Sequence, residues 1–216
     1  MTNEEFMQDF SLARRAMVDS QLRPEGVTDR DVLAAMSKVA REDFVPAEAR
    51  ALAYFDRPVK IGAGRSMMPP AALGKLLNAL GPRAGERALV VGSGTGYSAA
   101  LLRSIGLDVV ALESDRSLAS AAAAAGVETS VGELEMGWAK GAPYDLILLG
   151  GAVEEIPAAL VKQLREGGRL AGAVVERGVS RLVIGMAAGG ALGRRSIADA
   201  DVERLPGFER PRAFTF

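Results

Sequence analysis

The chain of 216 residues contains no cysteine and no histidine. Without cysteine it can form no disulfide, thiolate nucleophile or zinc-thiolate site, and without histidine it lacks the usual general base and the commonest metal ligand. Ser-His-Asp hydrolysis and Cys-His chemistry are therefore excluded, and we predict no metal site. Any catalysis must use carboxylates, hydroxyls, amines, the backbone or a reactive cofactor. A cofactor that carries its own leaving group fits this composition best.

Long uncharged apolar runs and an excess of one charge are also missing. The 26 basic and 27 acidic residues nearly cancel, so no basic face for nucleic acid is expected. No apolar run is long enough for a transmembrane helix, and the acidic N-terminus differs from a secretory signal. We therefore expect a cytoplasmic protein without nucleic-acid or membrane partners. With 49% hydrophobic residues at this length, a single domain is predicted.

The first part of the chain shows helical periodicity, with Thr28 and Asp31 spaced like a capping box. A stretch with several prolines and glycines, 44–70, is predicted to be an ordered but irregular connection that is long enough to cover a site. Gly81 and Pro82 end the last helical pattern of this part. The helices are predicted over 1–22, 27–39 and 70–80.

From Glu86 onward, short apolar runs alternate with helical ones, which is typical of parallel βαβ units. Strands are predicted over 86–94, 108–115, 127–131, 144–152 and 169–176. Helices are predicted over 96–106, 116–126 and 157–166, the last with Pro157 in its first turn and a glycine pair at its end. The segment 180–190 and the polar stretch after it would supply two more strands.

A glycine-rich turn, Gly92-Ser93-Gly94-Thr95-Gly96, follows the first of these strands. Glycine there lets the backbone approach a ligand closely, because a Cβ would obstruct the ligand or forbid the dihedral angles. The G-x-G-x-G spacing differs from the G-x-G-x-x-G of dinucleotide sites, and the turn lacks the Gly-Lys-Ser/Thr of a phosphate loop. Glycines that merely tighten the turn are the structural alternative.

Glu113 ends the next strand, roughly 20 residues beyond the turn, where a carboxylate can accept hydrogen bonds from both hydroxyls of a ribose. The alternative is a solvated charge at a strand end. Together the turn and the acid favour S-adenosylmethionine as cofactor and a Rossmann-like methyltransferase as the class of protein. In contrast, we interpret Asp145 as a structural residue and Trp138 and Tyr144 as packing residues.

The chain also resembles a known family, the protein-L-isoaspartate O-methyltransferases. The segments MVDSQL, GVTDRDVLAAM and REDFVP precede the glycine turn and are not general methyltransferase features. The other similar segments are AYFDRPVKIGAGRSMMPP, ERALVVGSGTGYSAALL, and APYDLILLGGA with QLREGGRL. The resemblance implies an α/β fold with a seven-stranded class I methyltransferase sheet and an N-terminal helical extension. A single domain over 1–216 is expected, with a helical, substrate-side part over 1–82 and a cofactor-binding part over 83–216.

The family methylates the carboxylate of abnormal isoaspartyl residues with S-adenosylmethionine, which starts the repair of damaged proteins. The resemblance therefore implies this activity, and protein or peptide substrates that carry isoaspartyl residues. Carried over by position, Glu113 holds the ribose, and Ser114 is a further cofactor-binding residue. Glu133 and Leu134 replace the last two residues of the family's Gly-Asp-Gly at the adenine. The residues expected under the methionine end of the cofactor are Gly92, Ser93, Gly94 and Gly96.

The family's Thr-x-Ser-x-Pro segment reads Ser66-Met67-Met68-Pro69-Pro70 here. Ser66 preserves the first hydroxyl and is the candidate catalytic residue, with a positioning role. Met68 replaces the second hydroxyl with a thioether, which cannot donate a hydrogen bond to a substrate carboxylate. An ionised carboxylate needs no general base to accept a methyl group, so alignment is the main requirement. Two alternatives are a methyltransferase of another carboxylate or small molecule, and a non-catalytic module that binds S-adenosylmethionine.

Overall fold

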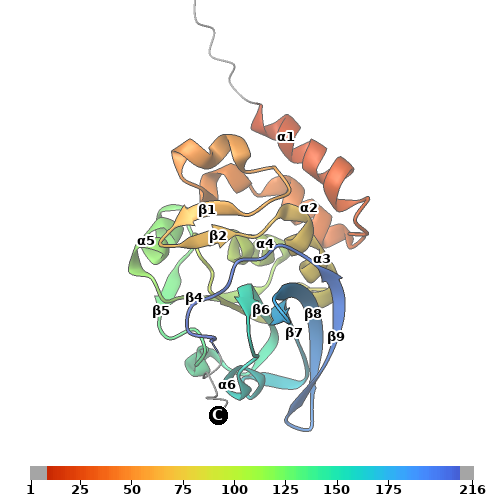
Figure 1. Cartoon of the computed structure of the whole chain (residues 1–216), viewed down its shortest axis with the longest axis vertical. Helices are drawn as coiled ribbons and strands as arrows, with labels where there is room; N and C mark the ends of the chain where they lie inside the picture. Colours follow the sequence, from red (N-terminus) through yellow and green to blue (C-terminus); the bar gives the residue numbers. More distant parts are fainter. Residues whose placement is uncertain (1–8, 210–216) are drawn as a thin grey trace, which may run out of the picture.

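The computed structural model describes residues 9–209, which form a mixed sheet with helices above it and a smaller hairpin at one end (Figure 1). The seven strands lie in the order β5-β4-β3-β6-β7-β8-β9. Strands β5 to β7 are parallel, whereas β8 and β9 return as antiparallel neighbours. The α/β fold class is confirmed. The strands are β3 (Arg87–Val91), β4 (Asp108–Glu113), β5 (Thr129–Val131), β6 (Tyr144–Val153), β7 (Leu164–Glu176), β8 (Val179–Ala188) and β9 (Ala191–Asp199).

Helices cover one face of the sheet, and the strands alternate between two buried clusters. Ala88 and Val90 of β3 face the helices and the N-terminal part, whereas Leu89 and Val91 face the opposite cluster. This period of two is what a strand buried on both faces requires. The helices are α1 (Phe10–Met17), α2 (Arg30–Lys38), α3 (Pro70–Leu80), α4 (Tyr97–Ile105), α5 (Arg116–Ala124) and α6 (Ala158–Val161).

The N-terminal part is helical as predicted, with two local differences. The pattern over 1–22 becomes α1 followed by a π-helical turn, Val18–Leu22, and its residues 1–8 lie outside the described part of the chain. The predicted capping box is wrong. Asp29 is the N-cap of α2, and its carboxylate accepts hydrogen bonds from the backbone N–H groups of Asp31 and Val32.

The stretch 44–70, predicted to be irregular, contains an antiparallel hairpin of β1 (Val59–Gly62) and β2 (Arg65–Met67). Ala63 and Gly64 make its turn with φ of 50° and 69°, which the glycine accommodates readily. The strands are short, and their alternating pattern is hidden by glycine and proline on either side. The hairpin stands over the carboxyl ends of the sheet strands (Figure 1).

The helix predicted over 157–166 is also wrong beyond its first turn. Only α6 is helical, with Pro157 as its N-cap, and β7 already begins at Leu164. Residues such as Gln163, Leu164 and Arg165 have good intrinsic helix propensity. Pairing with β6 overrides it, because Tyr144 lies in register with Leu164 and its N–H donates to the carbonyl of Gln163 at 2.8 Å.

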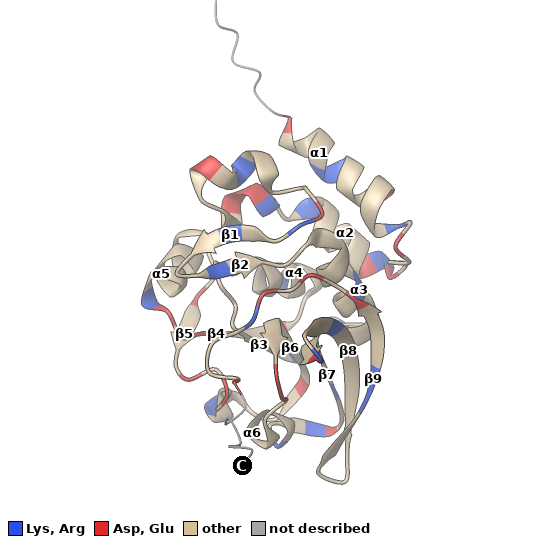
Figure 2. Cartoon of the chain, viewed as in Figure 1, with Lys and Arg blue, Asp and Glu red and all other residues tan. Residues whose placement is uncertain are grey.

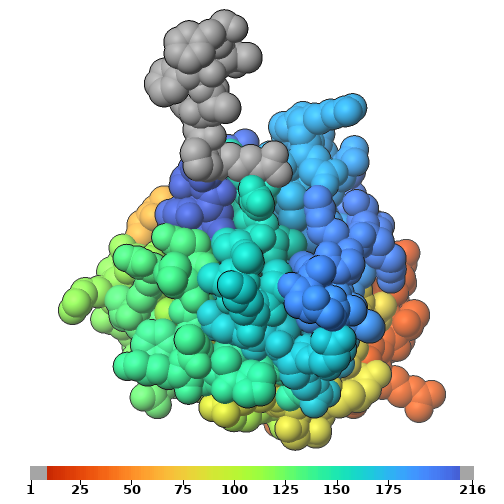
Figure 3. Space-filling view, turned by 90° about the horizontal axis from the view of Figure 1, so that it is seen from below, coloured from red at the N-terminus to blue at the C-terminus, as the bar shows by residue number. Residues whose placement is uncertain are grey.

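The second face of the sheet has little helical cover. Its buried cluster is completed by α6, by side chains from the loop after β5 and by the segment after β9. We call residues 202–208 of that segment the C-terminal strap; it crosses the carboxyl end of β6, where Arg204 forms a bridge with Ala152. Seen from below, the second half of the chain, coloured green to blue, occupies most of the visible surface, and the N-terminal part lies at its margin (Figure 3).

The two edges of the sheet differ. β5 has three residues, whereas β9 has nine and is mostly exposed, with Arg194 and Arg195 on it. Basic residues are visible along this edge in Figure 2. Among residues 9–209, no helix is long and apolar enough to cross a membrane.

Candidate active site

The glycine turn lies where β3 ends and α4 begins. Gly92, Gly94 and Gly96 have φ of 71°, 57° and 98°, a region that L-residues with a side chain rarely adopt. The N–H groups of Gly92 and Ser93 both donate to the carbonyl of Leu112 at 2.9 Å, which fastens the turn to β4. The backbone of the turn is therefore shaped by its glycines and held in place by the neighbouring strand.

Glu113 is fully buried at the end of β4 beside this turn. Its Oε2 accepts a hydrogen bond from the N–H of Gly94 at 2.7 Å, and its Oε1 accepts one from the N–H of Ser114 at 2.8 Å. A buried carboxylate requires hydrogen-bond partners of this kind. The interpretation of Glu113 as a solvated strand-end charge is wrong.

Arg65 of β2 supplies the third partner of Glu113. Its Nη1 lies 2.9 Å from Oε1 of Glu113, and its Nη2 donates to the carbonyl of Gly92 at 3.1 Å. Only 6% of the Arg65 side chain is exposed, so this is a buried ion pair. Sequence reasoning missed Arg65, although it is the only charged residue between Ile61 and Leu73. A lone charge in such a stretch is a signal for a buried partner.

The hairpin and the turn enclose a hollow of about 20 Å³. Ser66 and Met68 line it from the hairpin side, and Ser93 and Tyr97 line it from the turn. Within the described residues, the buried hydroxyl of Ser93 makes no hydrogen bond. The structure thus brings Ser66 and the glycine turn together, with the thioether of Met68 between the same walls.

A buried arginine supports the Met68 segment from behind. Arg41 donates through Nε to the carbonyl of Ala53 at 2.6 Å and through Nη2 to the carbonyl of Met68. Its guanidinium lies 5.0 Å from the centre of the Tyr97 ring, in cation–π contact. Burial lowers the pKa of Arg41, and the phenolic oxygen of Tyr97 partly opposes this shift. This arrangement ties the wall of the hollow to α4.

The two residues expected at the adenine differ in their exposure. Glu133 is exposed, whereas Leu134 is buried in the cluster on the second face of the sheet. Gly132, just before them, donates to the backbone carbonyl of Glu113 at 3.0 Å, so the segment does begin beside β4. Leu134 shares its cluster with Leu205 and Phe208 of the C-terminal strap.

The C-terminal strap lies directly on the ends of β3 and β6. The Cδ2 of Leu205 lies 2.6 Å from the position of a Cβ on Gly92 and 2.8 Å from one on Gly151. Any side chain at either glycine would overlap it. The strap is paired to β6 through its backbone. The N–H of Ala152 donates to the carbonyl of Glu203, and the N–H of Leu205 donates to the carbonyl of Ala152, both at 2.8 Å.

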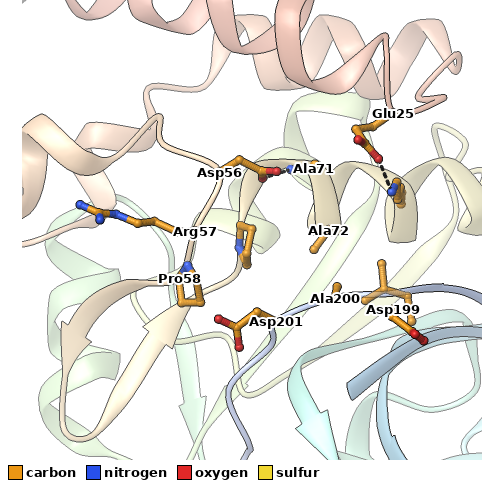
Figure 4. A pocket seen from close by; sticks show the side chains of 12 residues that line it. Glu25, Asp56, Arg57, Pro58, Ala71, Ala72, Asp199, Ala200 and Asp201 are labelled. Carbon is orange, nitrogen blue, oxygen red and sulfur yellow. Dashed lines mark hydrogen bonds and ion pairs between the residues drawn. The ribbon is translucent and has the colours of Figure 1, made fainter. Parts of the chain in front are cut away.

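A second hollow, of about 250 Å³, lies between α3, the lead-in to β1 and the end of β9 (Figure 4). Its acids and bases are partly satisfied within the chain, since Asp56 accepts from the N–H of Ala71 at 3.0 Å and Lys75 pairs with Glu25. None of its lining residues belongs to the glycine turn. Its size therefore does not make it the cofactor site.

Asp145, Tyr144 and Trp138, which the sequence indicated to be structural residues, make contacts that stabilise the fold. Asp145 accepts from the N–H of Arg87 at 2.7 Å and pairs with Arg165, at the end of the sheet opposite the turn. The Tyr144 hydroxyl donates to the carbonyl of Trp138 at 2.7 Å, and burial raises the pKa of Tyr144 to about 12. These groups hold the loop before β6.

A mixed seven-stranded sheet whose strand order reverses between β3 and β6, a glycine turn after its first strand and a buried acid at the end of the next define a Rossmann-like class I methyltransferase. A family model described as protein-L-isoaspartate(D-aspartate) O-methyltransferase matches residues 13–184. The chain belongs to this family, whose members are S-adenosylmethionine-dependent methyltransferases.

Individual relatives agree with this assignment. A protein-L-isoaspartate O-methyltransferase of Methylorubrum populi is 45% identical over 73% of this chain and 77% of that relative. One from Rhodopseudomonas palustris is 38% identical over 91% of this chain and 80% of that relative. A solved structure of this name has a TM-score of 0.78 at 22% identity and covers 90% of this chain and 66% of that one.

A Plasmodium falciparum structure, described as a complex with S-adenosyl-L-homocysteine, has a TM-score of 0.73 at 21% identity. It covers 89% of this chain and 97% of that one. At such identities the two solved structures show the fold alone.

Proposed function

We propose that this chain binds S-adenosylmethionine at the carboxyl ends of β3, β4 and β6 and methylates the carboxylate of isoaspartyl residues in proteins or peptides. The observation that carries the proposal is the buried Glu113 carboxylate, joined by a hydrogen bond to Gly94 in the glycine turn. In open α/β sheets, ligands bind outside the carboxyl ends of the strands, where these two residues lie. The family supplies the substrate class.

The residues present suit this cofactor. Glu113 offers the acceptor that two ribose hydroxyls need, and Ser114 lies beside it. Gly92, Gly94 and Gly96 would let the backbone approach the methionine end, and the unpaired hydroxyl of Ser93 is a hydrogen-bonding group still to be satisfied. Glu133 and Leu134 follow the end of β5 and are proposed for the adenine side.

When bound, S-adenosylmethionine supplies a methyl group on a sulfonium. The chain has to orient the acceptor carboxylate and exclude water, which can contribute several kcal/mol to a reaction of this kind. Ser66 is proposed to position that carboxylate, because its side chain lines the hollow beside the glycine turn. No residue is assigned as general base, since a carboxylate at pH 7 is already ionised.

Met68 favours a second candidate function, methylation of a different acceptor. It is buried in the same wall as Ser66 and offers only a thioether to whatever enters. A carboxylate would lose one hydrogen bond there, whereas a less polar acceptor would not.

The experiment that separates the candidates is transfer of labelled methyl from S-adenosylmethionine to an isoaspartyl peptide. The same peptide with a normal aspartyl residue is the matched control. Transfer to the isoaspartyl peptide alone supports the proposal. Transfer to neither peptide, with retained S-adenosylhomocysteine binding, contradicts the isoaspartyl assignment and moves the search to other acceptors or to a binding role.

A further inference from the structure

The chain's own side chains stand in the place proposed for the cofactor. Arg65 donates to Oε1 of Glu113 at 2.9 Å, while Oε2 already accepts from the N–H of Gly94. A ribose would need both oxygens of the Glu113 carboxylate. The Arg65 guanidinium therefore competes with one ribose hydroxyl for Oε1. Arg65 also donates to the carbonyl of Gly92, so its side chain lies over the start of the glycine turn.

The apolar part of the same space is taken by Leu205. Its methyl groups meet the bare backbone of Gly92 and Gly151, which is the close approach that these glycines would otherwise offer to a ligand. Ile61 of the hairpin fills the position over Gly94 in the same way, at 2.7 Å from a Cβ placed there. Leu205 is only 2% exposed, so this contact forms part of the packed interior.

The remaining room beside the turn is too small for a cofactor. The hollow of about 20 Å³ suits roughly one water molecule. Pockets for small molecules and cofactors usually measure about 300–1,000 Å³. Arg65 and Leu205 therefore have to leave before a nucleoside can enter.

The strap that carries Leu205 is fastened at its margin by exposed ion pairs. Glu203 pairs with Lys60 of β1, and Arg204 lies 2.6 Å from Glu154. The Lys60 side chain is 73% exposed, so salt screens its pair with Glu203 readily. These two exposed ion pairs are weak one by one, whereas the backbone hydrogen bonds to β6 and the buried Leu205 hold the strap more firmly.

We propose that this structure is a closed form of the cofactor cleft, in which Arg65 and the C-terminal strap act as an internal competitor of S-adenosylmethionine. The inference rests on the proposed function, because it takes the cleft to be the cofactor site. Cofactor binding is then coupled to release of Arg65 from Glu113 and of Leu205 from the glycine turn. The measured affinity equals the affinity of the open form multiplied by the fraction of open molecules.

The test is calorimetric titration with S-adenosylhomocysteine, which reads binding without turnover. Arg65→Gln removes the charge but keeps a side chain that can reach the carbonyl of Gly92. Leu205→Ala clears the apolar part of the cleft and carries the test alone if Arg65→Gln does not fold. Arg15→Gln is the matched control, because Arg15 is exposed on α1, away from the cleft.

We expect Arg65→Gln and Leu205→Ala each to raise the affinity tenfold or more, and Arg15→Gln to leave it unchanged. For the native chain we expect higher affinity at higher salt, as the Lys60–Glu203 pair weakens. Equal affinity of the native chain and both variants overturns the closed form and leaves the proposed function standing. If none of the proteins binds S-adenosylhomocysteine, both the closed form and the cofactor assignment are wrong.

Discussion

The N–H of Gly94 donates a 2.7 Å hydrogen bond to the carboxylate of Glu113, and so joins the glycine turn to the end of the neighbouring strand. The same carboxylate is paired with Arg65, so three segments of the chain meet at one buried charge. The turn, β4 and the hairpin consequently depend on one another. A substitution at any one of Gly94, Glu113 and Arg65 should therefore disturb the positions of the other two.

Replacement of Glu113 tests this dependence. Glu113→Gln keeps an acceptor for Gly94 but leaves the guanidinium of Arg65 buried without a carboxylate. Breaking a buried pair in this way costs about 3–5 kcal/mol. Urea unfolding should show a loss of this size, and Glu113→Gln combined with Arg65→Met should recover part of it. A double variant no more stable than Glu113→Gln alone argues against the pair as the cause.

Substitution at Gly94 should strain the turn. Gly94→Ala forces a side chain into the left-handed region, at about 1–2 kcal/mol, and places its Cβ against Ile61. We expect a lower melting temperature by about 2–4 °C per kcal/mol in a chain of this size. Adding Ile61→Ala should relieve the contact but not the dihedral strain, judged against Ile61→Ala alone. Gly85→Ala, with φ of 84° and open space around it, is the control for dihedral strain alone.

Met68→Ser should restore a hydroxyl in the wall shared with Ser66. A hydrogen bond to an ionised acceptor is worth about 1.5–3 kcal/mol. Methyl transfer to an isoaspartyl peptide should therefore rise about tenfold or more. S-adenosylhomocysteine affinity, measured alongside, should change little. A native chain that already methylates the peptide as fast as Met68→Ser would show that this hydroxyl is dispensable.

Asp29 should contribute a pH-dependent term to stability. Partial burial acts to raise the pKa of its carboxyl, but hydrogen bonds from Arg83 and from the first N–H groups of α2 prevail, so its pKa lies below the ordinary value of 3.8. The stabilisation is therefore complete above the unfolded-state pKa and is lost as the pH falls through the folded-state pKa. Asp29→Asn can still cap α2 but lacks this term. Urea midpoints of the two proteins should differ at pH 6 and converge towards pH 3.

The sequence sufficed to predict the turn and its acid, because both are local features at strand ends. Arg65 and Leu205 could not be assigned to the site in this way. Arg65 reaches Glu113 across 48 residues of sequence, and Leu205 arrives from the opposite end of the chain. Such contacts depend on how the hairpin and strap fold over the sheet. The same reason explains the error in the helix over 157–166, where strand pairing prevailed over helix propensity.

The two edge strands of the sheet determine how readily another chain can pair with it. β5 offers only three residues for pairing with an added strand. On β9, any added strand would lie beside the exposed side chains of Arg194 and Arg195. An extended segment of a protein substrate would therefore gain few backbone hydrogen bonds at β5 and would meet two positive charges at β9.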